Sequence, residues 1–234
     1  MFVIMSINSN HETVMNQTTP QKPQRRTQAE RRAATKKRLI DATIDTLVAS
    51  GYHGTTVKEI CRRAGLSQGA LFCMFRNRAE LIVETLREIN ARTLQRFVAD
   101  FQVPDGPDQL IDQVLNLIER IAQAPESHAR REIWSALRTD EQLQQCLTSV
   151  PLFDREHERN LIRSAVATVP GLKVEPEAAL AALKLAFRYF ESMAAISPIV
   201  DVDEEAASVR SLLKVLAEQH VGIREPEGSK GSVS

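Results

Sequence analysis

The sequence has few of the residues on which metal sites, disulfide frameworks and catalytic centres depend. Its three cysteines, Cys61, Cys73 and Cys146, form no Cys-x-x-Cys pair, which argues against a structural zinc site and against a disulfide framework. A glycine-rich phosphate loop, a His-Glu-x-x-His motif and a convincing catalytic triad are all missing, and the five histidines are scattered. We therefore expect no metal, no cofactor and no enzymatic activity.

No apolar run predicts a membrane span. The most apolar stretch, residues 177–196, is interrupted by Lys184, Arg188 and Glu191, which are expensive inside a bilayer. The opening MFVIM is too short for a signal peptide and lacks a basic start. These features favour a cytoplasmic protein that is not associated with a membrane.

The net charge is zero, but its distribution is lopsided. Residues 20–90 contain 14 Lys and Arg against 7 Asp and Glu, whereas residues 91–234 contain 16 against 22. A basic N-terminal part on an acidic remainder is typical of a protein with a nucleic-acid-binding module. A short basic arm of Lys22, Arg25 and Arg26 precedes the first expected helix.

Residues 55–78, TTVKEICRRAGLSQGALFCMFRNR, predict two short helices joined by a tight turn. Thr56 has the capping-box spacing to Glu59. Gly65 suits the left-handed conformation that ends a helix, and Ser67 can cap the second helix. That helix begins with small or amide-bearing residues, which let its N-terminus approach phosphate and bases closely. The pattern is that of a helix-turn-helix, whose second helix enters the DNA major groove, although an ordinary helical corner is the alternative on pattern alone.

This stretch carries a family resemblance. The matching positions are Thr55-Thr56-Val57, Ala64-Gly65-Leu66-Ser67, Gly69-Ala70-Leu71-Phe72, Phe75, Asn77-Arg78 and Glu80-Leu81. Residues 31–89 thereby closely resemble the DNA-binding domain of TetR-family transcriptional regulators. The resemblance says little about residues 105–234, but it implies a small-molecule site in that half.

The resemblance also implies which residues contact DNA. Thr56 and Arg78 stand where the family contacts phosphates, and Gln68 stands where it contacts bases or backbone. Phe72 stands where the family has a tyrosine, so one hydroxyl contact is missing, and Arg78 stands where the family usually has a lysine. The full predicted set is Thr55, Thr56, Ser67, Gln68, Gly69, Ala70, Phe72, Cys73, Met74 and Arg78.

The remaining periodic segments all read as helical, so the predicted fold class is all-α: a three-helix helix-turn-helix domain plus a larger helical ligand-binding and dimerisation domain. Helices are expected at residues 28–50, from Asn77 to before Pro104, and at 110–122, 131–138, 141–169, 177–196 and 204–221. Thr27 with Glu30, and Asn77 with Glu80, have the capping-box spacing at the starts of two of these helices, and Pro125 is expected to break the helix at 110–122. The expected divisions are an unstructured basic arm (1–26), the helix-turn-helix domain (27–77), a connecting helix (78–103), the ligand-binding and dimerisation domain (104–224) and a polar tail (225–234).

Two sets of residues in the C-terminal part are candidates for binding. An apolar ligand pocket with a polar anchor is predicted from Trp134, Arg138, Phe153, His157, Phe187, Tyr189 and Met193. Apolar stripes on the last two helices predict a dimer through a four-helix bundle, with Leu180, Leu183, Phe187, Phe190, Val209, Leu212, Leu213 and Leu216 at the interface. The alternative in both cases is that these side chains pack within one chain.

The interpretation favoured by these patterns is a homodimeric transcriptional regulator, most simply a repressor released by a small-molecule ligand. Its expected partners are a palindromic double-stranded DNA operator, an unidentified small-molecule effector and a second copy of the chain. The alternatives are a transcriptional activator, a ligand-independent DNA-binding protein, an all-helical enzyme and a purely structural dimerisation module.

Overall fold

The computed structural model describes residues 27–102, 107–149 and 175–220, together with a few positions between 156 and 167. Every regular element within these residues is a helix, which confirms the all-α fold class. The elements are α1 (Gln28–Gly54), α2 (Val57–Ala64), α3 (Gln68–Phe72), α4 (Arg78–Asp100), α5 (Pro107–Ala122), α6 (Pro125–Ala136), α7 (Glu141–Thr148), α9 (Pro176–Ile196) and α10 (Asp203–His220).

Short polar caps fix where the N-terminal helices begin. The Thr27 hydroxyl accepts from the Glu30 amide, and the Glu30 carboxylate accepts from the Thr27 amide at 2.8 Å, which confirms the predicted capping box. Asn77 caps α4 by accepting from the Glu80 amide at 2.8 Å, also as predicted. At Gly51 the backbone leaves the helical region (φ 65°, ψ −176°), and a short helical turn then continues to Gly54.

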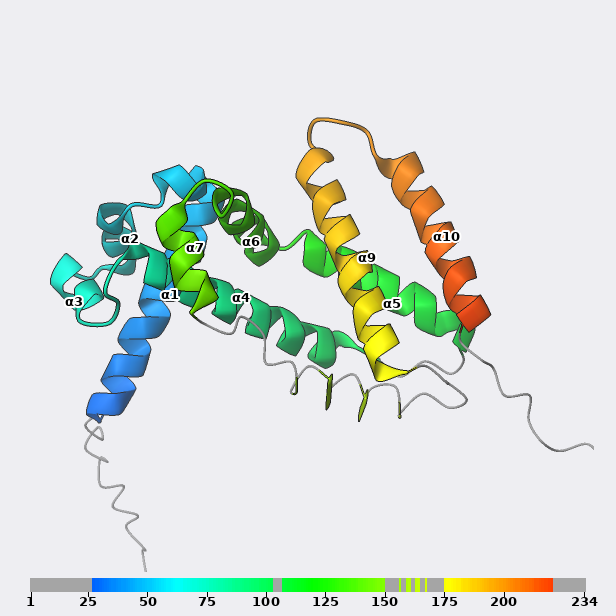
Figure 1. The fold of residues 1–234 in the computed structure, drawn as a ribbon, viewed down its shortest axis with the longest axis horizontal. Coiled ribbons are helices and arrows are strands. Elements are labelled where there is room, and N and C mark those ends of the chain that lie inside the picture. The colour runs from blue at the N-terminus through cyan, green and yellow to red at the C-terminus, as the bar shows by residue number, and fades with distance from the viewer. Residues whose placement is uncertain are drawn as a thin grey trace, which may run out of the picture.

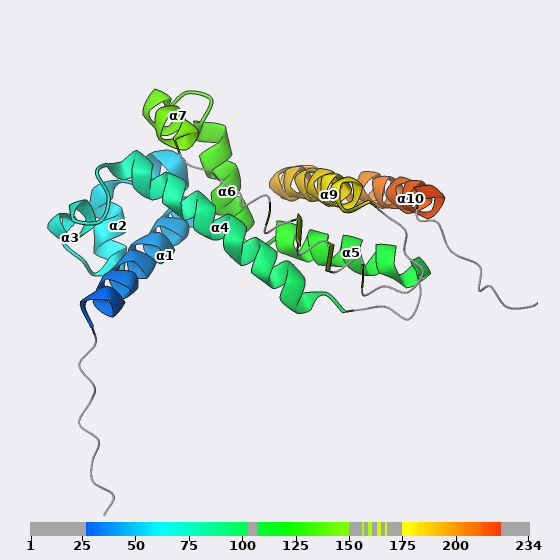
Figure 2. The ribbon, with the colours of Figure 1, turned by 60° about the horizontal axis from the view of Figure 1, so that its bottom comes forward.

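Helix α4 runs from the α1–α3 group to the α5–α9–α10 group, and the two groups have separate cores (Figure 1). The first core contains buried side chains from α1 to α4, such as Leu39, Leu71 and Leu86, and continues into Ile133 of α6 and Leu143 of α7. The second core joins α5 to α9 through residues such as Ile118 and Phe190. Helices α9 and α10 both lie over one side of α5 (Figure 2).

The first core extends beyond the domain boundary that the sequence analysis drew near residue 103. Helix α6 packs along α1, and α7 packs on α4, so both cover the helix-turn-helix unit although they follow α5 in the chain. Pro125 also differs from expectation, because it begins α6 as well as ending the preceding apolar run. Proline suits the first turn of a helix, where its missing amide leaves no hydrogen bond unmade. Beyond Thr148, the expected helix at 141–169 lies largely outside the described residues.

Candidate functional site

The two helices of the predicted motif form as expected. A hydroxyl side chain caps the start of each helix, and an arginine of α1 contacts the turn between them. The Ser67 hydroxyl accepts from the Ala70 amide at 3.1 Å, and the Thr56 hydroxyl accepts from the Glu59 amide at 3.2 Å. Gly65 has the left-handed conformation, with φ 60° and ψ 40°. From α1, the Arg38 guanidinium donates to the carbonyl of Ala64 at 2.6 Å and so satisfies a free end of α2.

The segment from Gly65 to Gly69 also matches the pattern Gly-x-Ser-x-Gly, which surrounds the nucleophilic serine of α/β-hydrolases. In those enzymes the serine follows a strand and projects from a strained turn. Here Ser67 lies between two helices, and its hydroxyl caps α3. This environment gives the serine the structural role of a helix cap.

A network around Tyr52 connects the helix-turn-helix unit to α6 and α7. The Tyr52 amide donates to the Glu132 carboxylate at 2.9 Å, and the Tyr52 hydroxyl donates to the Asp140 carboxylate at 2.6 Å. Burial, together with the hydrogen bond to Asp140, raises the pKa of Tyr52 to about 12. The same hydrogen bond lowers the pKa of Asp140.

Arg78 completes this network from the start of α4. Its Nε donates to the carbonyl of Thr55 and its Nη2 to the carbonyl of Tyr52, both at 2.6 Å. Its guanidinium carbon lies 4.1 Å from the centre of the Tyr52 ring, within the range of a cation–π contact. The guanidinium therefore fixes the connection between α1 and α2.

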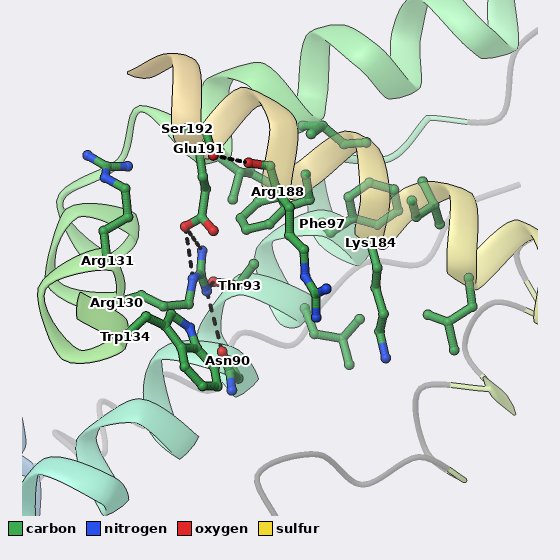
Figure 3. A pocket seen from close by; sticks show the side chains of 16 residues that line it. Asn90, Thr93, Phe97, Arg130, Arg131, Trp134, Lys184, Arg188, Glu191 and Ser192 are labelled. Atoms are coloured by element: carbon green, nitrogen blue, oxygen red, sulfur yellow. Dashed lines mark hydrogen bonds and ion pairs between the residues drawn. The ribbon is translucent and has the colours of Figure 1, made fainter. Parts of the chain in front are cut away.

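A cavity of about 580 Å³ lies between α4, α5, α6 and α9 (Figure 3). This volume falls within the usual range for small-molecule sites. The residues lining it are Asn90, Thr93, Leu94 and Phe97 of α4, Ile118 and Ile121 of α5, Arg130, Arg131 and Trp134 of α6, and Leu180, Leu183, Lys184, Phe187, Arg188, Glu191 and Ser192 of α9. Most of this wall is apolar, with charged groups gathered on α6 and α9.

A buried ion pair crosses the cavity wall from α6 to α9. Arg130 donates to the Glu191 carboxylate from Nε at 2.9 Å and from Nη2 at 2.8 Å. The same guanidinium donates to the hydroxyls of Ser127 and Thr93 at 2.8 and 3.0 Å. It also lies 4.7 Å from the centre of the Phe187 ring. Both charges are compensated, and the pair joins the helix that packs on α1 to the core of the C-terminal part.

Within the described residues, no helix is long and apolar enough to cross a membrane, and no group of metal-ligating side chains comes together.

Comparisons with known proteins assign the helix-turn-helix unit to a family. The family model for bacterial regulatory proteins of the tetR family matches residues 39–85. An uncharacterized HTH-type transcriptional regulator of Mycobacterium tuberculosis (strain ATCC 25618 / H37Rv) is 30% identical over 152 residues, which cover 65% of this chain and 76% of the relative. The chain belongs to the TetR family. It is thus a helix-turn-helix, DNA-binding transcriptional regulator.

Two solved structures have the same fold. A transcriptional regulator from Rhodococcus sp. Rha1 is 20% identical, with a TM-score of 0.52 and coverage of 79% of this chain and 95% of that one. The multidrug binding protein EbrR, complexed with imidazole, is 14% identical, with a TM-score of 0.54 and coverage of 82% of this chain and 98% of that one. At these identities the likeness establishes the arrangement of the helices.

Most of the predicted DNA-contacting residues lie on the surface of the TetR-like motif. Thr56, Ser67, Gln68, Gly69, Phe72 and Cys73 are exposed, and Ala70, Met74 and Arg78 are half-buried. Thr55 is fully buried, and its hydroxyl donates to the carbonyl of Gly51 at 2.7 Å. Thr55 therefore packs beneath the motif, and its side chain is not offered to a duplex.

The predicted pocket residues divide into three groups. Trp134 and Phe187 line the cavity. Arg138, Tyr189 and Met193 are not among the lining residues, and Tyr189 packs against the second core instead. Phe153 and His157 lie outside the described residues.

Several side chains predicted for the dimer interface lie elsewhere. Leu180, Leu183 and Phe187 line the cavity, and Phe190 is buried in the core between α5 and α9. Val209 is half-buried and Leu212 is exposed, while the side chains of Leu213 and Leu216 lie outside the described residues. The apolar side chains that α9 and α10 leave most exposed include Leu185, Ile196, Leu212 and Val215.

The charged part of the cavity was missed in the sequence, although a signal for it was present. Lys184, Arg188 and Glu191 stand four and three residues apart on an otherwise apolar helix, so they share one face. In the sequence these three charges were interpreted only as evidence against a membrane span. Charges on one stripe of a covered helix also indicate a polar interior site.

Proposed function

We propose that this TetR-family regulator is a homodimeric, cytoplasmic repressor, which binds a palindromic operator and is released from it by a small molecule held in the α4–α5–α6–α9 cavity. One observation carries the proposal. Helix α6 forms one wall of the cavity and also packs along α1 of the helix-turn-helix unit. EbrR, a structural neighbour named as a multidrug binding protein and complexed with imidazole, supports a small molecule as the effector.

The path from the cavity to the DNA-binding unit is short. Arg130, Arg131 and Trp134 of α6 line the cavity, and Glu132 of the same helix accepts the Tyr52 amide. Tyr52 in turn holds Arg78, which begins α4. A ligand that moves α6 would therefore move the connection between α1 and α2 and change the spacing of the two reading helices in a dimer. An unequal affinity of the ligand for the two arrangements is what would release DNA.

The dimer would form through the uncovered faces of α9 and α10. Leu185 is 66% exposed and Leu212 is 57% exposed, although each lies on a helix packed against α5. Apolar side chains left uncovered on two neighbouring helices are typical of an interaction surface. A two-fold dimer would present one reading helix per subunit, which matches a palindromic operator.

The test measures operator affinity and effector affinity in the same preparation. Footprinting on DNA beside the protein's own gene would supply the operator. An effector that binds the cavity should weaken operator binding by about 5–150-fold, and the operator should weaken effector binding by the same factor. Ligands that bind the cavity without changing operator affinity would reject release by a ligand.

Base reading should depend on Gln68, which is exposed at the start of α3. We expect Gln68→Ala to change base preference at one or two positions per half-site, costing about 1–3 kcal/mol on the preferred base. Binding to a library of single-base operator changes would measure this. Gln145→Ala, at an exposed position of α7, is the matched control and should change no preference. A uniform loss of affinity in Gln68→Ala would mean that α3 lies differently in the groove.

A further inference from the structure

The charged groups of the cavity wall are mostly positive. Arg130, Arg131, Lys184 and Arg188 face a single carboxylate, that of Glu191, in the part of the wall that the structure describes. Glu191 is already bound by Arg130 at 2.8 Å. Once this pair is set aside, the charged groups that remain on the described wall are Arg131, Lys184, which has an interaction partner of its own, and Arg188.

Two of these cations project together from α9. Lys184 and Arg188 stand one helical turn apart, and Figure 3 shows both side chains extending from α9 in the same direction. Arg188 is exposed, and its guanidinium has no hydrogen-bond or ion-pair partner among the described residues. It is therefore placed to bind an anionic group at the edge of the cavity.

Arg131 adds to the positive potential from the α6 side. Its Nη1 donates to the carbonyl of Ala122 at 3.3 Å, and no carboxylate in the described part of the chain lies within ion-pair distance of it. Burial lowers the pKa of Arg131, because the charged form loses hydration, and the opposing charges of Glu191 and Glu132 offset this only in part. A bound anion nearby would stabilise that charge.

The same wall offers little to a cationic ligand. Glu191 is neutralised by Arg130, and the face of the Phe187 ring is already in contact with the Arg130 guanidinium. Apart from Asn90, Thr93 and Ser192, the rest of the wall is apolar, with Leu94, Phe97, Ile118 and Leu183 available to an uncharged body.

We propose that the ligand of this cavity is an amphipathic organic anion, whose carboxylate binds Arg188 beside Lys184 and whose apolar body lies against α4, α5 and Trp134. This inference rests on the proposed function, because it names the chemical class of the effector. The positive rim attracts and orients the carboxylate, and the apolar wall contributes most of the affinity.

The experiment uses three probes of equal chain length: decanoate, decanol and decyltrimethylammonium, each below the concentration at which it forms micelles. Trp134 is the only tryptophan in the chain and lines the cavity, so its fluorescence reports binding. We expect decanoate to bind about tenfold more tightly than decanol, which is the gain from one charge-assisted contact, and the cation to bind most weakly.

Arg188→Gln should weaken decanoate binding by about three- to tenfold and leave decanol binding unchanged, because it removes the charge and keeps a polar side chain at an exposed position. Arg188 is exposed, so the variant should fold normally. Arg138→Gln is the matched control, since Arg138 is also exposed but lies outside the cavity wall. The control should bind all three probes like the wild type.

The outcomes distinguish this inference from the proposed function. Equal binding of all three probes, no saturable binding of decanoate, or an Arg188→Gln variant that binds decanoate normally would overturn the anionic ligand. If decanol or the cation nevertheless released the operator, ligand-controlled repression would stand without it. If decanoate bound through Arg188 but left operator affinity unchanged, the ligand class would stand and release would fail.

Discussion

The N-terminal and C-terminal parts of the molecule differ in how completely they bury their apolar side chains. In the N-terminal part, α1 to α4 bury their apolar faces against one another and under α6 and α7. In the C-terminal part, α9 and α10 cover α5 but leave Leu185, Leu212 and Val215 exposed, and a cavity remains beside them. The first part is complete within one chain. The second part has surfaces that a ligand and a second copy of the chain could complete.

The largest effect is expected when the ion pair between Arg130 and Glu191, which connects the two parts, is broken. Glu191→Ala leaves the buried Arg130 without its counter-charge, and we expect a loss of about 3–5 kcal/mol in the free energy of unfolding. Denaturant unfolding followed by Trp134 fluorescence and by helical circular dichroism would measure it. The double variant Arg130→Met/Glu191→Leu removes both charges and should recover most of the loss. A single variant within about 1 kcal/mol of wild type would show that the pair is unimportant for stability.

The role of the exposed leucines of α9 and α10 in the proposed dimer can be tested by introducing charge at these positions. Leu212→Asp and Leu185→Asp should weaken the dimer by about a hundredfold or more, because each carboxylate would be buried at the interface without a partner. Monomer stability should change little, since both positions are exposed in the single chain. Sedimentation equilibrium would measure the dimer. Ala207→Asp, at another exposed position of α10, serves as the control. Unchanged dimers in both leucine variants would move the interface elsewhere.

The stability of the N-terminal part should depend on Arg78. Arg78→Ala removes two donors from the carbonyls of Thr55 and Tyr52, and we expect a loss of about 2–3 kcal/mol in stability. Arg78→Lys keeps the charge but not the planar fork, so it should recover only part of that loss. A residue that acted on phosphate alone would leave stability intact and reduce the salt slope of DNA binding by about one. Unfolding curves and binding titrations at two salt concentrations separate these roles.

The smallest effect, and the one that depends on pH, is expected at Tyr52. Tyr52→Phe loses the hydrogen bond to Asp140, which should cost about 1 kcal/mol at neutral pH. The raised pKa of about 12 means that the folded chain keeps a proton which the unfolded chain loses near pH 10. The contribution of this group is therefore full below about pH 10 and is lost as the pH rises towards 12. The gap in stability between wild type and variant should close over that interval, and a constant gap would contradict the pKa assignment.

What the sequence could predict was local. The caps at Thr27, Thr56, Ser67 and Asn77 were found because a cap depends on residues three apart. Trp134 and Phe187 were predicted for the pocket and line the cavity, but the pairing of Arg130 with Glu191 could not be found from the sequence, because the two residues meet only through the packing of α6 and α9. The expected helix at 131–138 even began after Arg130. The break in α1 at Gly51 agrees with the expected end of the first helix at residue 50. Arg78 was interpreted from resemblance as a phosphate contact, and its bonds to the carbonyls of Thr55 and Tyr52 join residues 23 and 26 positions apart, which periodicity does not reveal.

The shared core of α1 and α6 has a consequence for how such a protein can be rearranged by recombination. The order of the elements along the chain suggests that the helix-turn-helix domain could be separated near residue 103 and joined to another C-terminal domain. The core does not follow that division, because Ala129, Ile133 and Leu143 complete the packing of the helix-turn-helix domain from beyond residue 103. A helix-turn-helix domain transferred to another protein would have to include α6 and α7, or the new C-terminal domain would have to supply helices that pack on it in the same way. The helix-turn-helix unit and the helices beyond residue 103 are therefore constrained to change together.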